Sequence, residues 1–443
     1  MPLAALAALG GAYTSSVLPL LAAAAAAFFI SGARVAADRD SRVLDICLVV
    51  LLSGIVLQVV PLPASLVTSL SPNSAGVQAL FSLDAAGRSG VLSIDGVVTR
   101  DTLASAAAVI LLFWAARSVF SQGGVRLSAR AITWSGVVAA LVGLAQRATS
   151  PTLLLWTWKP FDPGARPFGP FVNRNHFAMW LLMAGALAVG CTVAHVRSHA
   201  VLQRRSTRHR LRDLLADGTG LFLAGSAALM WLTLIASTSR GALLGLLVAG
   251  LSVLMMSGRR LRSRGSFRVM ACSLVALLGW GIWSNVGALA DRFDPKRGEL
   301  RRETVWLETL PVLRDFPIAG IGAGTYAQAM VQYQRTERRA LFNEAHSEYL
   351  QLAAEGGLLL VVPALGALLA WIRLARRRLR EDLHDVVWIR AGALAGISGV
   401  AVQCIWDSAL RMPANALLFA LLAAIVIHHR QAPIEDPSAR QAA

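Results

Sequence analysis

The stretch from Tyr349 to Ile372 reads YLQLAAEGGLLLVVPALGALLAWI. A bilayer core of about 30 Å needs roughly 20 predominantly apolar residues in one helix, so this run is long enough to cross a membrane. A polar loop that contains His346 precedes the run, and an arginine-rich segment that begins at Arg373 follows it. The same arrangement, an apolar run with one arginine-rich flank, recurs along the chain.

The composition of the chain agrees with a membrane protein. Hydrophobic residues make up 56% and charged residues only 15% of the sequence, and the mean hydropathy is +0.57, whereas soluble domains carry about 25% charged residues. We therefore predict an all-α, polytopic transmembrane helical bundle of about 11–12 spans. The assigned spans are Thr14 to Ser31, Val43 to Val60, Thr102 to Ala116, Ala131 to Ala145, Phe177 to Ala194, Gly220 to Ala236, Ala242 to Met256, Val269 to Ala288, Tyr349 to Ile372, Val386 to Ile405 and Pro413 to Ile427.

No segment has the character of a separate soluble domain, so residues 1–443 are predicted to form one integral membrane domain. Within it, residues 289–346 are predicted to form a large loop that carries short helices. Leu300 to Leu313 mixes apolar with charged residues and predicts an amphipathic helix that roofs the outer face. Gly320 to Gly324 lacks the βαβ context of a nucleotide-binding loop, so we predict a tight turn with close backbone packing there.

Arginine clusters predict the orientation of the chain, because Lys and Arg are retained on the cytoplasmic side during membrane insertion. They fall on alternate connections, which leaves the longer polar loops and the large loop on the opposite, periplasm-like face. The clusters are Arg34, Arg39 and Arg42; Arg117, Arg126 and Arg130; Arg197, Arg204, Arg205, Arg208, Arg210 and Arg212; Arg259, Arg260, Arg262, Arg264 and Arg268; and Arg373, Arg376, Arg377, Arg378 and Arg380.

This distribution also explains the net charge of +17. The basic clusters face the anionic lipid head groups of the membrane, so membrane lipids are expected partners and nucleic acid is not. The four cysteines, Cys47, Cys191, Cys272 and Cys404, lie within predicted spans and lack metal-ligand spacing. They are interpreted as packing residues.

The depth of the ionisable groups in the membrane distinguishes an enzyme from a transporter. Ion-coupled carriers place such groups near the bilayer midplane, where the coupling ion binds. Here the polar residues gather at the outer ends of the predicted spans, which favours a reaction site at the membrane surface. They are Asn173, Arg174, Asn175 and His176; Ser237, Thr238, Ser239 and Arg240; His346 and Glu348; and Asp407 and Arg411.

Two arginines in these clusters are candidates for binding a phosphate group. Arg174 and Arg240 each lie in a short polar segment at a helix end, and the planar guanidinium fork suits phosphate oxygens. A lone arginine at this depth also serves as an interfacial anchor, so both interpretations stay open from the residues alone. If the arginines act together, they fit a lipid diphosphate head group.

His346 is the candidate base. It stands directly before a long apolar helix, and an imidazole with an ordinary pKa near 6.5 accepts a proton at neutral pH. We expect Tyr349 and Leu350 to share its helical face, and Glu348, Gln351 and Glu355 to project elsewhere. A salt bridge to Arg411 is expected for Asp407 in preference to orienting His346, and His176 is a second, weaker candidate base.

Four segments together resemble the O-antigen ligase and polymerase superfamily of bacterial inner-membrane glycosyltransferases. The resemblance runs from Phe168 to Asn415 and includes the stretch Asp407 to Asn415. The segments are Phe168-Gly169-Pro170-Phe171-Val172-Asn173-Arg174-Asn175-His176-Phe177-Ala178; Ser239-Arg240-Gly241; Asp315-Phe316-Pro317-Ile318-Ala319-Gly320-Ile321-Gly322-Ala323-Gly324-Thr325-Tyr326; and His346-Ser347-Glu348-Tyr349-Leu350-Gln351-Leu352-Ala353-Ala354-Glu355-Gly356.

The resemblance implies a GT-C-like fold in the bacterial inner membrane. It also implies transfer of a glycan from an undecaprenyl-diphosphate-linked donor to an acceptor hydroxyl on the periplasmic face, without a cofactor or metal. Arg174 and Arg240 would hold the diphosphate, and His346 would take the hydroxyl proton. The secondary candidates are Asn173, His176, Arg301, Glu348, Tyr349, Asp407 and Arg411.

The acceptor implied first is lipid A-core, as in lipopolysaccharide O-antigen ligases. A growing glycan is the acceptor if the chain is a polymerase, and the shared motifs leave this alternative open. A protein O-oligosaccharyltransferase fits less well, because the chain lacks the larger C-terminal domain that many of them carry. A flippase for lipid-linked glycans is the alternative outside the enzymes, and it predicts charged residues along a path through both leaflets.

Overall fold

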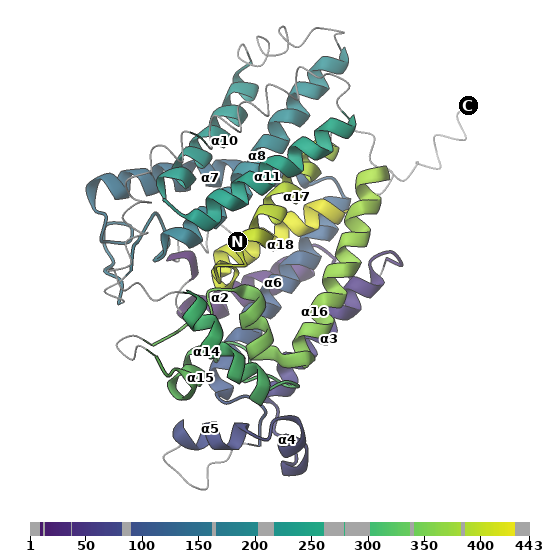
Figure 1. The fold of residues 1–443 in the computed structure, drawn as a ribbon. Coiled ribbons are helices and arrows are strands. Elements are labelled where there is room, and N and C mark those ends of the chain that lie inside the picture. Colours follow the sequence, from purple (N-terminus) through teal and green to yellow (C-terminus); the bar gives the residue numbers. More distant parts are fainter. Residues whose placement is uncertain are drawn as a thin grey trace, which may run out of the picture.

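The computed structural model is an assembly of helices, and each predicted span that it describes coincides with one of them (Figure 1). It describes residues 9–11, 14–36, 38–81, 90–161, 165–202, 217–260, 279, 302–336, 341–381 and 386–429. The predicted span Val269 to Ala288 lies outside these ranges apart from Gly279. The long helices are α2 (Val17–Ile30), α3 (Arg42–Val59), α6 (Gly96–Ser121), α7 (Val125–Thr149), α8 (Arg174–Leu202), α10 (Gly218–Ala236), α11 (Arg240–Arg260), α16 (Glu348–Glu381), α17 (Val386–Gln403) and α18 (Pro413–Ile427).

Seven of these helices in the described part of the chain are long and apolar enough to cross a membrane: α3, α6, α7, α8, α10, α16 and α17. The apolar segments Val17–Ile30, Arg240–Met256 and Pro413–Ile427 are shorter. The described ranges contain isolated β-bridges and no strand. The chain is therefore an all-α, multi-pass membrane protein, as predicted.

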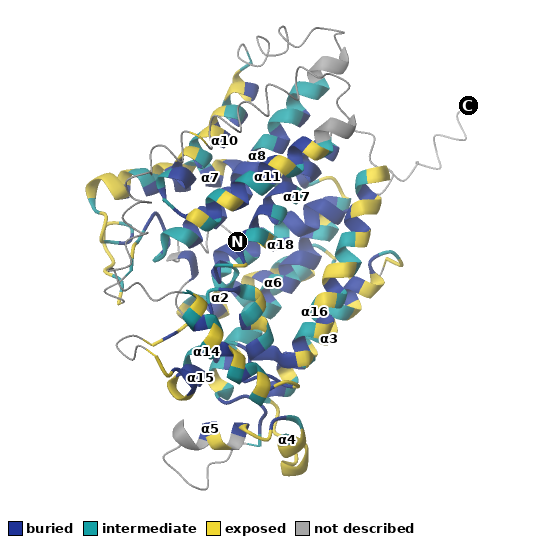
Figure 2. Cartoon of the chain, viewed as in Figure 1, coloured by how far each residue is buried: buried dark blue, intermediate teal, exposed yellow. Residues whose placement is uncertain are grey.

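Helices α8 and α17 form the centre of the bundle, and α3 and α16 lie at its periphery (Figure 2). In the spanning windows, 83% of α8 and 72% of α17 are buried, against 28% of α3 and 17% of α16. Glycines allow the central pair to approach closely: a Cβ on Gly190 of α8 would lie 2.5 Å from the carbonyl oxygen of Trp388. Small residues at helix contacts are the usual solution where lipid supplies no hydrophobic driving force.

Helix α16 is interrupted at Gly357, whose φ is 52°. The loop that follows Phe316 packs its backbone into this break, because Leu358 N–H donates to the Pro317 carbonyl at 2.9 Å and Ile321 N–H donates to the Ala354 carbonyl at 3.0 Å. The backbone groups freed by the break are thus satisfied within the protein, as a membrane-embedded helix requires. The prediction of a tight turn with close backbone packing at Gly320 to Gly324 is confirmed.

Gly320 illustrates how close the packing is. Its φ is +66°, and a Cβ there would lie 2.3 Å from the carbonyl oxygen of Glu355. The side-chain amide of Gln58 in α3 donates to the carbonyls of Ala319 at 2.7 Å and Glu355 at 3.0 Å. The loop and the first turns of α16 therefore form one rigid unit.

Short helices gather at the end of the bundle where α16 begins (Figure 1). They are α4 (Ala64–Leu70), α5 (Ser74–Phe81), α14 (Arg302–Asp315), α15 (Tyr326–Tyr333) and the 3₁₀ turn η3 (Ala409–Arg411). The predicted helix from Leu300 to Leu313 corresponds to α14. Its inner face buries Val305 and Val312, while Leu307 and Leu310 are exposed on its outer face. We call this end of the bundle the site end.

The opposite end of the bundle carries the described arginines of the predicted clusters, and we call it the arginine-rich end. The cluster residues outside the described ranges are Arg204, Arg205, Arg208, Arg210, Arg212, Arg262, Arg264 and Arg268. Arg117 at the end of α6 pairs with Asp45 of α3. Arg378 near the end of α16 pairs with Asp40 at 3.3 Å. These pairs join clusters that are far apart in the sequence, which supports the predicted distribution of arginines on one face.

Candidate active site

His346 lies in the loop before α16, and its backbone has a left-handed φ of 51°. Because α16 begins at Glu348, His346 is outside the helix, and the prediction that it shares a helical face with Tyr349 and Leu350 is wrong. A positive φ is costly for a residue with a side chain and persists where the surroundings hold it. The imidazole is thus presented by a constrained loop.

Three hydrogen bonds hold this loop. Ala345 N–H donates to Gln351 Oε1 at 3.0 Å, and the Ala345 carbonyl accepts from Trp306 Nε1 of α14 at 3.0 Å. Phe342 N–H donates to Gln334 Oε1 at 2.9 Å. Helix α14 therefore fixes the His346 loop, which agrees with the predicted position of this helix over the site.

The surroundings of His346 favour its neutral form. The nearest carboxylate is that of Glu344, with its Oε2 at 4.0 Å from His346 Nδ1. Burial lowers the pKa of the imidazole below its ordinary value, Arg302 and His176 lower it further, and Glu344 and Asp407 oppose them. The side chain keeps 38% of its surface exposed. His346 is thus an accessible base at neutral pH.

His176 and Asp407 form a buried pair beside this histidine. His176 is near the start of α8, and its Nε2 lies 3.6 Å from Asp407 Oδ1. Burial alone would raise the pKa of Asp407, but the imidazole of His176 together with Arg302 and His346 holds it below its usual range. Asp407 therefore pairs with His176 and acts electrostatically on His346, and the predicted salt bridge from Asp407 to Arg411 is wrong.

Arg411 pairs instead with Glu355 of α16. Its Nη1 lies 2.9 Å from Glu355 Oε1, and this carboxylate also accepts from Gly324 N–H at 2.7 Å and from Gln351 Nε2 at 2.9 Å. Glu355 is 8% exposed. The interpretation that Gln351 and Glu355 project away from the site is corrected, because both belong to the network that joins α16 to η3.

Glu348 and Tyr349 hold the neighbouring backbone. Glu348 Oε1 accepts from the N–H groups of Leu410 at 2.7 Å and Arg411 at 3.2 Å, so it caps η3. The Tyr349 hydroxyl donates to the Ala401 carbonyl of α17 at 2.7 Å. Both secondary candidates therefore position the site through backbone groups.

Arg174 and Arg240 come together at the turn between α10 and α11. Arg174 begins α8, and its Nη1 donates to the hydroxyl of Thr238 at 2.7 Å. Thr238 has a left-handed φ of 55°, and Arg240 follows two residues later as the exposed first residue of α11. Asn173 caps α8, because its Oδ1 accepts from Asn175 N–H at 2.9 Å. One guanidinium is thus anchored at the turn and the other flanks it.

Hydrogen bonds connect this arginine turn to the histidine cluster. Gln403 Nε2 at the end of α17 donates to the Asn175 carbonyl at 3.1 Å, and the next residue, Cys404, accepts from Glu348 N–H at 3.0 Å. Asn415 Nδ2 donates to the His176 carbonyl at 3.1 Å. Hydrogen bonds at the site end therefore join the helix ends that carry the arginine turn to those that carry the histidine cluster.

The structure brings together most of the residues predicted for the site, and it adds three that the sequence analysis did not assign. Arg301 lies outside the described residues. The additions are Glu344, Arg302 and Glu355; the spacing of Gln351 and Glu355 by one helical turn was the available signal for the last of them. Among the residues that the structure describes, no three His, Cys, Asp or Glu side chains are grouped to hold a metal ion.

Comparison with protein families gives a match to part of the chain. Residues 225–365 match the family model described as O-antigen ligase. This segment contains Arg240, His346 and Glu355, while Arg174, His176 and Asp407 lie outside it. No curated protein matches the sequence. The match confirms the predicted resemblance to the O-antigen ligase superfamily.

Proposed function

We propose that this chain, which carries an O-antigen ligase domain at residues 225–365, is a glycosyltransferase of the bacterial inner membrane. The donor is a glycan linked to undecaprenyl diphosphate, and the acceptor is a hydroxyl of lipid A-core on the periplasmic face. The observation that carries the proposal is the buried His176–Asp407 pair, which acts electrostatically on His346 and shares a hydrogen-bonded framework with the Arg174 and Arg240 turn.

In the reaction, the acceptor oxygen attacks the anomeric carbon of the donor sugar as the bond from that carbon to the diphosphate oxygen breaks. Undecaprenyl diphosphate leaves with the bonding electron pair. His346 takes the proton of the attacking hydroxyl, because its lowered pKa keeps it neutral and its ring is partly exposed. A single displacement of this kind inverts the anomeric centre.

Asp407 offsets the positive charge that His346 gains in this step. Its carboxylate is ionised and acts electrostatically on both histidines. A fixed charge placed where opposite charge develops stabilises the transition state without reorganisation. His176, paired with the same carboxylate, is positioned to take part in moving the proton onward.

The two arginines bind the leaving diphosphate. The hydroxyl of Thr238 holds the Arg174 guanidinium, so part of the entropy of fixing this long side chain is already lost before the donor binds. Arg240 is exposed at the N-terminal end of α11, where the helix dipole also favours negative charge. Together they stabilise the charge that develops on the diphosphate.

A transfer assay with purified protein in nanodiscs tests the function. The donor is an undecaprenyl-diphosphate-linked oligosaccharide, and lipid A-core is either present or absent. We expect product only with lipid A-core. Longer lipid-linked chains in its absence would identify a polymerase, and movement of donor across a sealed bilayer without any transfer would identify a flippase.

Replacing Arg174 or Arg240 by Lys should lower the catalytic efficiency roughly tenfold or more, because a point charge does not reproduce the bidentate fork. The measurement is kcat/KM against donor concentration in the transfer assay. The matched control is Arg126→Lys, which changes an exposed arginine at the other end of the bundle and should leave the rate unchanged. Full activity of both site variants would show that these arginines are interfacial anchors.

A further inference from the structure

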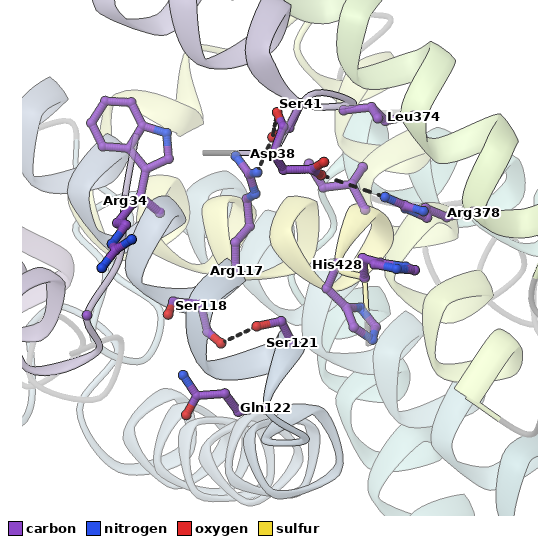
Figure 3. A pocket seen from close by; sticks show the side chains of 14 residues that line it. Arg34, Asp38, Ser41, Arg117, Ser118, Ser121, Gln122, Leu374, Arg378 and His428 are labelled. Carbon is purple, nitrogen blue, oxygen red and sulfur yellow. Dashed lines mark hydrogen bonds and ion pairs between the residues drawn. The ribbon is translucent and has the colours of Figure 1, made fainter. Parts of the chain in front are cut away.

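A cavity of about 550 Å³ (Figure 3) is lined by residues of the arginine-rich end and by none of the candidate active-site residues. Its wall is formed by the α2–α3 connection, the last turns of α6 and α16, and the residues that follow α18. The volume is within the range of small-molecule sites. The proposed glycosyl transfer uses none of the residues that line it.

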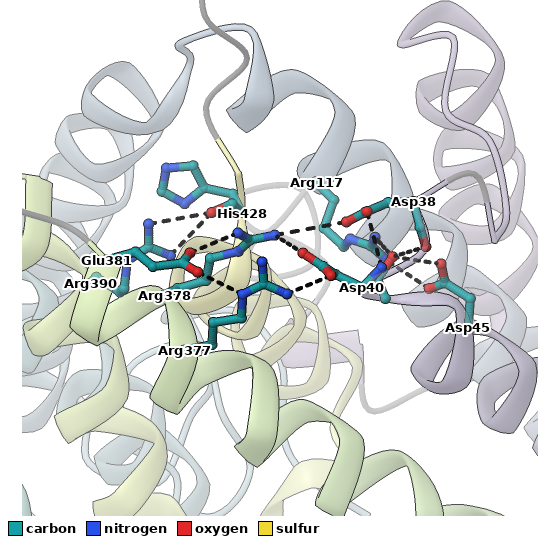
Figure 4. Close-up of polar contacts among 10 residues, drawn as sticks. Asp38, Asp40, Asp45, Arg117, Arg377, Arg378, Glu381, Arg390 and His428 are labelled. Atoms are coloured by element: carbon teal, nitrogen blue, oxygen red, sulfur yellow. Dashed lines mark hydrogen bonds and ion pairs between the residues drawn. The ribbon is translucent and has the colours of Figure 1, made fainter.

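Arginines outnumber carboxylates in the lining of this cavity. Arg34, Arg117 and Arg378 line it, and Asp38 is the only carboxylate among the lining residues. Carboxylates anchor two of these arginines: Asp45 pairs with Arg117, and Arg378 pairs with Asp38 at 3.8 Å and with Asp40 and Glu381 (Figure 4). The anchored guanidinium groups are therefore fixed at the wall.

One arginine of the lining has no acceptor in the described part of the chain. Arg34 is exposed and forms no hydrogen bond or ion pair with any residue that the structure describes. No described carboxylate neutralises its guanidinium, so an anion that enters the cavity can form a charge-assisted hydrogen bond with it.

The remaining lining indicates the kind of anion. The hydroxyls of Ser41, Ser118 and Ser121 donate to acceptors within the protein, and Trp114, Leu374 and Ile427 add apolar surface. Guanidinium groups suit phosphate oxygens, and apolar surface beside them suits the glycerol and acyl region of a lipid. The location, at the end that the arginine distribution predicts to be cytoplasmic, coincides with the head-group layer.

We propose that this cavity binds the phosphate group of an anionic phospholipid from the arginine-rich leaflet. Arg34 is the recognition residue, and Arg117 and Arg378, which are held by their carboxylates, are the preset part of the site. A bound head group joins the α2–α3 connection to the end of α16, the helix whose other end follows His346. The lipid therefore braces the helix that carries the candidate active site.

The test is a titration of the full chain, purified in detergent, with dioleoyl phosphatidylglycerol, dioleoyl phosphatidylcholine or inorganic phosphate, followed by thermal unfolding. We expect saturable stabilisation by phosphatidylglycerol alone. Arg34→Gln should weaken its apparent affinity about tenfold, and the matched Arg126→Gln, an exposed arginine at the same end, should not. Arg34 has no partner to lose among the described residues, so the variant is expected to fold.

The other outcomes are distinct. Equal stabilisation by inorganic phosphate, lost in Arg34→Gln, would replace the lipid by free phosphate as the ligand of the same site. Equal stabilisation by phosphatidylcholine, or equal affinity of Arg34→Gln and Arg126→Gln for phosphatidylglycerol, would overturn the proposal.

Discussion

His346→Ala is expected to reduce glycan transfer by about 10²–10⁴-fold, the usual contribution of a general base. The loss should appear in kcat, with the affinity for the lipid-linked donor nearly unchanged, because the imidazole acts on the acceptor hydroxyl in the chemical step. The measurement pairs single-turnover transfer with a direct donor-binding assay. Loss of donor binding with normal turnover of the bound fraction would exclude His346 as the base.

The matched control is His195→Ala. His195 also pairs with a carboxylate, that of Asp217, but it lies toward the arginine-rich end of α8. We expect this variant to transfer glycan at the wild-type rate. Addition of free imidazole should partly restore transfer by His346→Ala, since the missing group is an imidazole that accepts a proton.

The pH profile follows from the same group. The pKa of His346 is lowered by burial from its ordinary value of 6.5, and the neutral form is the active base. Activity is therefore retained at neutral pH and falls as the pH drops through a value below 6.5. The acid limb of kcat/KM should disappear in the variant that lacks the imidazole. An acid limb that persists unchanged in His346→Ala would assign it to another residue.

Arg411→Ala is expected to lower stability by about 3–5 kcal/mol, the cost of leaving a buried carboxylate without its counter-charge. Glu355 is 8% exposed and faces Arg411 at 2.9 Å. Transfer should also fall, because this pair links η3 to α16 beside the His346 loop. Thermal unfolding in detergent measures the first effect, and the transfer assay measures the second.

A double variant distinguishes two effects on stability: that of leaving a buried charge unpaired and that of losing the contacts of Arg411. Glu355→Gln combined with Arg411→Met removes both charges, so it should be more stable than Arg411→Ala alone. The surface control is Arg335→Ala at the site end, which changes an exposed side chain and should alter stability by less than about 0.5 kcal/mol. A single variant no less stable than this control would show that the Glu355 pair contributes little.

The spans were predictable because the membrane imposes its requirement locally. Each run needs its own apolar length and its own satisfied backbone, so α7 or α10 can be found without knowing its neighbours. The break in α16 was not predicted. It depends on the backbone of the Gly320 loop filling the gap at Gly357, and that contact joins segments separated in the sequence by α15 and the His346 loop.

The residue types of the site could be predicted from the sequence, but the ion pairs that these residues form could not. Arginine and histidine at the ends of apolar runs are visible in the sequence, so Arg174, Arg240, His176 and His346 were assigned. Which carboxylate serves which cation depends on tertiary packing. The helical spacing of Asp407 and Arg411 suggested a local pair, whereas Asp407 faces His176 of α8 and Arg411 faces Glu355 of α16.

The close contact between α8 and α17 has a consequence for biogenesis. Helix α8 is the more apolar of the two, with a mean hydropathy of 2.0 in its spanning window against 1.4 for α17, which also carries Arg390. The guanidinium of Arg390 donates to backbone carbonyls at the end of α18, including that of Ile425. During synthesis α8 is stable in the lipid bilayer before α17 covers the side of α8 that carries Gly190. Helix α17 becomes stable only after α18 has been made. The centre of this protein is therefore completed last.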